Sequence, residues 1–188
     1  MKSPREFIVH PKDNKRYNNT KDIGGVDFII SSSEEDHRFS NREATVVETP
    51  IGYKGPVQQG DTLLVHHNVF KYYNDMYGRQ KSGKSFLKDD LFFIDNEQFY
   101  RYKNKDTWKC HDRYCFIKPI VAEKKGSLEK YCKYEPLMGI AKYLNEYLKI
   151  KGVKEGDTVC FTPHSEYEFT VDDEVLYRVY DHQVTVSL

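Results

Sequence analysis

The sequence predicts an all-β protein made of two small barrels in tandem. The chain has 188 residues, enough for two domains of about 90 residues each. It contains 15 Tyr and 11 Phe, and aromatic residues favour the half-buried surface of a sheet. Three short pieces also occur twice, in the same order, which predicts two copies of one β-domain.

Each repeated piece is typical of a strand bounded by a turn. The first is a strand that ends in proline, the second is a Gly-Asp turn that opens a strand, and the third is an acidic turn followed by an apolar strand. The pairs are 5–11 and 113–119, 57–65 and 153–161, and 86–93 and 169–176. Three matches in the same order are hard to attribute to chance, so we expect an internal duplication.

The duplication places the first domain at 1–103 and the second at 112–188. We expect the boundary at 103–107, which is polar and has no hydrophobic periodicity. In the repeated turn, Gly60 and Gly156 supply the backbone freedom that the turn needs. The alternation that follows each glycine predicts a strand with one buried face.

One segment has the pattern of both a helix and a strand. As a helix, residues 136–148 would place Ile140 and Leu144 on one apolar stripe. If the repeat register holds, residues 140–143 form instead a strand that corresponds to 44–47. We favour the strand.

The order of these motifs resembles the GroES co-chaperonin family. The second copy carries the family's carboxyl half best, in 152–161 and 183–186, and the first copy carries its amino half, in 5–11 and 23–30. Residues 23–30 resemble the family's mobile loop, in which two glycines precede three apolar residues. The resemblance implies two GroES-like β-barrels, the first with a mobile-loop-like segment at 14–41 and a long hairpin insertion.

The resemblance also implies a partner-binding site. In the family, the apolar triplet of the loop docks into a groove on the apical domain of a GroEL-type chaperonin. Phe28, Ile29 and Ile30, together with Val26, match that triplet, although Asp27 is inserted after the glycines. Such a plug is expected to be flexible alone and to order on docking. The alternative is that these residues form an ordinary buried strand.

The second copy departs from this pattern. Residues 122–132 contain neither a double glycine nor an apolar triplet. The resemblance therefore implies one partner-binding loop per chain, which lowers the avidity that a ring draws from many weak contacts.

The function implied is that of a co-chaperonin, a non-enzymatic protein that forms a homo-oligomeric ring and caps a GroEL-type chaperonin to assist protein folding. The alternative is a structural or virion assembly protein built from the same GroES-like barrels, which the insertion 68–85 and the missing second loop favour. No catalytic residue and no cofactor are expected in either case.

The composition argues against nucleic-acid and membrane partners. Lys plus Arg and Asp plus Glu each number 29, so the net charge is zero, whereas binding to phosphates needs a basic face. No stretch approaches the about 20 apolar residues of a membrane span. Residues 1–6 do not resemble a signal peptide, so we expect a cytoplasmic protein.

No metal site is expected from the cysteines and histidines. Cys110, His111 and Cys115 are close in sequence, and Cys132 could complete a zinc site, but the paired short spacings of structural zinc sites are missing. The adjacent histidines at 66–67 should point to opposite faces of a strand and so should not share an ion.

Residues 78–85 match the phosphate-binding pattern G-x-x-x-x-G-K-[ST]. A true P-loop follows a buried parallel strand and opens a helix. Here tyrosines and polar residues precede the match, and a turn into a strand follows it. We therefore expect an exposed hairpin tip.

We predict that Lys84→Ala leaves any activity intact, because the strand–loop–helix context of a P-loop is missing. Titration calorimetry should detect no ATP binding to the wild-type protein. Micromolar ATP binding that the variant loses would contradict this prediction.

Overall fold

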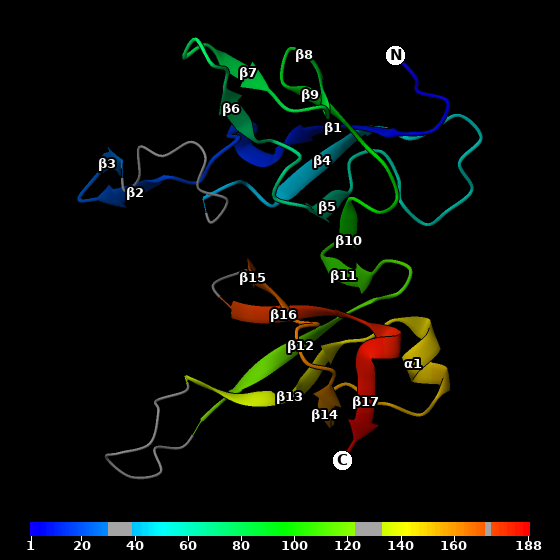
Figure 1. Cartoon of the computed structure of the whole chain (residues 1–188). Coiled ribbons are helices and arrows are strands. Elements are labelled where there is room, and N and C mark those ends of the chain that lie inside the picture. The colour runs from blue at the N-terminus through cyan, green and yellow to red at the C-terminus, as the bar shows by residue number, and fades with distance from the viewer. Residues whose placement is uncertain (30–38, 123–132, 172–173) are drawn as a thin grey trace. The chain divides into compact units, whose positions relative to one another are not determined.

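The computed structural model consists of two compact all-β units (Figure 1). It describes residues 1–29, 39–122, 133–171 and 174–188. The units are Met1–Trp108 and Lys109–Leu188. The all-β class is confirmed, and the sheets are antiparallel. Within the described residues neither large sheet closes into a barrel, so the barrel form stays a prediction.

The first unit is built on a seven-stranded sheet with the order β11-β10-β5-β4-β1-β9-β8. Its strands are β1 (Phe7–Pro11), β4 (Glu43–Glu48), β5 (Thr62–Val65), β8 (Phe86–Lys88), β9 (Leu91–Ile94), β10 (Phe99–Asn104) and β11 (Thr107–Cys110). Two separate hairpins are formed by β2 (Thr20–Ile23) with β3 (Val26–Ile29), and by β6 (Tyr72–Asn74) with β7 (Gln80–Ser82). A single 3-10 turn, Lys12–Asn14, follows β1.

The second unit is built on a six-stranded sheet with the order β15-β16-β12-β13-β14-β17. Its strands are β12 (Tyr114–Val121), β13 (Tyr134–Tyr143), β14 (Thr158–Phe161), β15 (Tyr167–Val171), β16 (Glu174–Tyr180) and β17 (Val184–Ser187). A short helix, α1 (Glu146–Ile150), follows β13, and a 3-10 turn, Asp181–Gln183, precedes β17. No helix of the described residues has the length and apolar character needed to cross a membrane.

The two units share one strand order. The order β10-β5-β4-β1-β9-β8 of the first unit matches β17-β14-β13-β12-β16-β15 of the second, strand for strand. Six buried core positions also correspond, namely Phe7 and Cys115, Val9 and Ile117, Val46 and Ala141, Leu63 and Val159, Val65 and Phe161, and Ile94 and Val179. The topology therefore repeats as the sequence does.

The repeated Gly-Asp turn has the same hydrogen bonds in both units. The N–H of Gly60 donates to the carbonyl of Val46, and that of Gly156 donates to the carbonyl of Ala141, each at 2.8 Å. The carboxylate of the following aspartate accepts a hydrogen bond from the backbone N–H three residues earlier, also at 2.8 Å in both copies. The turn thereby ties the third strand of each sheet to the second.

Residues 140–143 belong to a strand, as expected, but the register to the first copy differs by one residue. Val47 in β4 and Lys142 in β13 are the extra residues of a bulge that both units share. The residue that corresponds to Val46 is therefore Ala141, whereas the sequence comparison had matched Val46 with Lys142. Both units carry the bulge at the same place, so the correspondence follows from strand pairing and not from the bulge itself.

The segment that ends β13 combines the two alternatives considered for it. Asn145 caps α1, because its side-chain oxygen accepts a hydrogen bond from the Leu148 N–H at 3.1 Å. Leu144 and Leu148 are both buried in the core of the second unit. The predicted helical stripe is wrong for Ile140, which lies in β13, and Leu144 precedes the short helix.

The expected boundary at 103–107 is a hairpin, not a linker. Lys105 and Asp106 form the turn between β10 and β11, with φ of 47° and 70°. Both are polar residues in the left-handed region, as two-residue hairpin turns require. The compact units divide after Trp108.

A glutamine that precedes the last strand also occupies the same position in both copies. The side-chain oxygen of Gln98 accepts from the Asp95 N–H at 3.1 Å, and that of Gln183 accepts from the Tyr180 N–H at 2.9 Å. Gln98 directly precedes β10, and Gln183 directly precedes the corresponding strand β17. The sequence comparison did not reveal that both glutamines accept a backbone hydrogen bond from the residue three positions earlier.

Glu174 links three strands of the second unit at the surface. Its carboxylate lies 2.9 Å from the Lys118 ammonium and 3.0 Å from that of Lys142. The hydrogen bond from Lys118 is the main reason that the pKa of Glu174 is lowered from its ordinary value, and burial opposes it. The carboxylate form is therefore favoured in the folded unit.

Because the folded pKa lies below the unfolded one, Glu174 should stabilise the second unit fully above the ordinary carboxyl pKa. We predict that this contribution is lost as the pH falls through the folded value. Between pH 7 and pH 3, urea unfolding should show that the wild type loses up to about 1 kcal/mol of unfolding free energy that Glu174→Gln does not lose. Equal acid sensitivity of the two proteins would contradict the prediction.

We also predict that Gly60→Ala and Gly156→Ala destabilise their units by similar amounts. The φ angles are +89° and +99°, and nothing lies within 4 Å of an added Cβ, so the cost is backbone strain of about 1–2 kcal/mol. Gly83, whose φ is not in the left-handed region, provides the control. A Gly83→Ala loss as large as the other two, measured by urea unfolding, would count against this account.

Candidate functional site

The loop between β1 and β4 carries the residues expected to bind a partner, and its ends are tied together. The Asn18 N–H donates to the Phe39 carbonyl at 2.7 Å, and the Asn41 N–H donates to the Arg16 carbonyl at 2.9 Å. The mobile-loop-like segment 14–41 therefore has a hydrogen-bonded base. We call residues 16–18 and 39–41 the two feet of the loop.

The described part of the loop above its first foot is a β-hairpin. Gly24 and Gly25 form the turn between β2 and β3, with φ of 66° and 84°. Positive φ at both turn residues is typical of the tight turns that join antiparallel strands. Figure 1 shows this hairpin apart from the main sheet of its unit. The corresponding region of the second copy, 123–132, lies outside the described residues.

The hairpin exposes large apolar side chains on one face. Ile23 pairs with Val26, and side chains alternate along a strand, so Ile23, Val26 and Phe28 share a face while Ile29 lies on the other. Their exposed fractions are 56%, 57%, 50% and 71% respectively. A buried strand is therefore wrong for Val26, Phe28 and Ile29. Ile30 lies outside the described residues.

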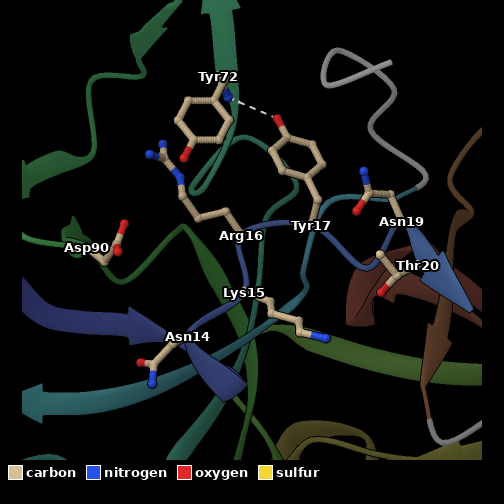
Figure 2. A pocket seen from close by; sticks show the side chains of 8 residues that line it. All are labelled: Asn14, Lys15, Arg16, Tyr17, Asn19, Thr20, Tyr72 and Asp90. Carbon is tan, nitrogen blue, oxygen red and sulfur yellow. Dashed lines mark hydrogen bonds between the residues drawn. The ribbon is translucent and has the colours of Figure 1, made fainter. Parts of the chain in front are cut away.

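Arg16, in the first foot, is held by the hairpin β6–β7. Its side chain is buried, with 8% exposed. Nε donates to the Phe70 carbonyl at 3.0 Å, and Nη1 and Nη2 donate to the Ser82 hydroxyl at 3.2 and 3.4 Å. The guanidinium carbon lies 3.5 Å from the centre of the Tyr72 ring, as Figure 2 shows. A stacked guanidinium of this kind is a cation–π contact.

Both feet of the loop contact residues 66–85, which connect β5 to β8. The Tyr17 ring stacks on Tyr72 with centres 5.8 Å apart, and its hydroxyl accepts a hydrogen bond from the Tyr72 N–H at 2.9 Å (Figure 2). In the second foot, the Ser40 hydroxyl donates to the His67 carbonyl at 2.8 Å. Residues 66–85, which we call the insertion, thus contact both feet and support the base of the loop.

A cavity of about 370 Å³ lies beside the first foot. It is lined by Asn14, Lys15, Arg16, Tyr17, Asn19, Thr20, Tyr72 and Asp90. Figure 2 shows that the Lys15 ammonium and the Asp90 carboxylate point in different directions. The donors of Arg16 are engaged by Phe70 and Ser82, so no set of groups converges on a ligand here.

The P-loop match is an exposed hairpin, as expected. Gly78 closes the turn between β6 and β7, and residues 80–82 and 86–88 are strands. The Gly83 N–H donates to the Lys71 carbonyl at 3.2 Å. Residues 71–90 are all described and contain no helix, so the phosphate cradle of a P-loop is not formed.

No metal site is found in the part of the chain that the structure describes. No cluster of three or more His, Cys, Asp or Glu side chains occurs there, and Cys132 lies outside it. Cys115 is buried, and burial raises the pKa of its thiol.

The His66 and His67 rings lie 4.1 Å apart, so the expectation that they point to opposite faces is wrong. β5 ends at Val65, so the alternation of side chains along a strand does not extend to His66 and His67.

Sequence reasoning missed two residues of this site, Ile23 and Arg16. Ile23 joins the apolar face only through its pairing with Val26 across the glycine turn. A hairpin reading of the Gly-Gly pair could have found it. Arg16 contacts residues 54 and 66 positions away, and no local pattern announces such contacts.

Comparison with known proteins adds no family. A scan against protein-family models found no match, and a search of curated proteins also found none.

Proposed function

We propose that this chain is a co-chaperonin-like protein whose β2–β3 hairpin docks into an apolar groove of a GroEL-type chaperonin. The observation that carries the proposal is the apolar face formed by Ile23, Val26 and Phe28, each at least half exposed. It lies on a loop that connects the first two strands of a sheet. In the GroES-like resemblance, the docking loop has that same position in the chain.

The repeated strand order supports the fold part of the proposal, which is two GroES-like barrels in tandem. β1 pairs with β4 and β9, and its counterpart β12 pairs with β13 and β16. The Gly-Asp turn ties β5 to β4 in the first unit and β14 to β13 in the second. The proposal further includes assembly into a homo-oligomeric ring and a cytoplasmic location.

Burial of apolar side chains would drive the docking. Each large side chain moved from water into a groove contributes about 1.5–3 kcal/mol. Part of this is offset by the ordering of side chains at the interface. A ring that presents several hairpins at once turns weak single contacts into strong capping. No catalytic group is needed for this activity.

A structural or assembly role for the same fold is the alternative. The observation that favours it is the tip of the β6–β7 hairpin, where Tyr73, Met76 and Tyr77 are 49%, 87% and 76% exposed. This tip offers a second apolar contact surface that a chaperonin cap does not require.

The prediction that tests the docking face uses two variants. Val26→Ser with Phe28→Ser should weaken binding to a GroEL-type chaperonin in the presence of ATP by at least about 100-fold, because two anchor side chains are lost. Ile29→Ser, on the opposite face, should retain most of the affinity. Thermal stability should stay near that of the wild type in both, because exposed substitutions usually change it by less than about 0.5 kcal/mol.

Binding can be measured by surface plasmon resonance with immobilised chaperonin. Equal affinity of the double variant and the wild type would contradict the proposal. The assembly alternative is favoured instead if neither the wild type nor the variants bind chaperonin and if Tyr73→Ser with Met76→Ser disrupts self-assembly.

A further inference from the structure

We infer that Arg16 and Tyr72 form a clamp by which the insertion 66–85 positions the β2–β3 hairpin for docking. The inference rests on the proposed function for what the hairpin binds, but not for how it is held. Arg16 and Tyr72 act as positioning residues, because their contacts join the first foot of the loop to the insertion and do not involve the exposed apolar face.

The geometry makes the clamp specific to arginine. The guanidinium uses Nε for one carbonyl and both Nη atoms for the Ser82 hydroxyl, and its carbon lies 3.5 Å from the centre of the Tyr72 ring. A lysine ammonium cannot make this planar set of contacts. Phe92 also lies near the guanidinium, with 4.8 Å from its ring centre to the guanidinium carbon, and Phe92 is part of the buried core. The foot is thus fixed to the interior of the unit.

The hairpin needs such a support. A two-stranded hairpin is only marginally stable in water, and this one does not pair with the main sheet. Holding the feet together offsets part of the entropy that closure of the loop costs. The hairpin can then meet a partner in its paired form, which lowers the cost of binding. On this inference the hairpin is already paired before docking, whereas the sequence predicts a plug that orders on docking.

The two copies provide an independent argument. In the second unit, β14 connects to β15 through residues 162–166 alone, whereas in the first unit residues 66–85 connect β5 to β8. The copy that carries the long insertion is also the copy with the double glycine at 24–25. The insertion and the docking hairpin therefore occur together in one unit.

The test compares neighbouring tyrosines of β6 in the full chain. Tyr72→Leu removes the ring that contacts Arg16 and Tyr17, while Tyr73→Leu removes a ring that is half exposed. Amide hydrogen exchange of the free protein is the readout. Exchange in residues 20–29 should accelerate about tenfold in Tyr72→Leu, since the contact is a desolvated cation–π pair. It should be unchanged in Tyr73→Leu, and β4 and β5 should keep their protection.

Ser82→Ala is the second variant, in case Tyr72→Leu disturbs folding. It removes only the acceptor of Nη1 and Nη2 and should accelerate exchange in 20–29 severalfold. The inference is overturned if both variants exchange like the wild type there, or if β4 and β5 lose protection equally, which indicates a merely structural role.

Chaperonin affinity of the same proteins separates this inference from the proposed function. If the hairpin loosens in Tyr72→Leu and its affinity falls severalfold, both stand. If the hairpin loosens while even the wild type does not bind chaperonin, the clamp stands and the proposed function fails.

Discussion

An isolated two-stranded hairpin cannot bury both of its faces, and this constraint governs the first unit. Among the described residues, the β2–β3 hairpin does not pair with the main sheet, and Ile23, Val26 and Phe28 are each at least half exposed. Exposed apolar surface of this kind is unfavourable unless something covers it. The loop that presents it is therefore tied at its feet, and the ties lead through Arg16 to the core. The contacts of Arg16 thus connect the base of the loop to the core of the unit.

The second unit has the same framework in its described residues. The same Gly-Asp turn, the same bulge between the first two strands and the same glutamine before the last strand recur there. These features determine strand register, so they are retained where the loops differ. The two copies have diverged in their connections, at 66–85 and in the crossover between the first two strands, while the frame has stayed constant. Such divergence is typical of a scaffold whose loops carry function.

Much of the frame could be predicted from the sequence, because turns and strand alternation are local. The Gly60 and Gly156 turns and the strand at 140–143 belong to this class. The correspondence between the copies was displaced by one residue, because strand pairing determines which residues correspond and the sequence alone does not give it. At 103–107 the sequence did not distinguish a hairpin turn from a linker, because polar turn residues occur in both.

The candidate site was less accessible to sequence reasoning. Phe28 and Ile29 were expected to act together, whereas strand pairing puts them on opposite faces. Arg16 could not be found at all, because its partners come from a distant hairpin. Side-chain direction and long-range contact are properties of the folded chain.

We propose that the face of Ile23, Val26 and Phe28 is a docking surface. Electron cryomicroscopy of the protein mixed with a GroEL-type chaperonin and ATP tests it most directly. The account predicts a capped complex in which Phe28 is seated in an apolar groove of the apical domain, with the clamp at Arg16 intact. A complex held through another surface, or chaperonin rings without a cap at saturating protein, would contradict it.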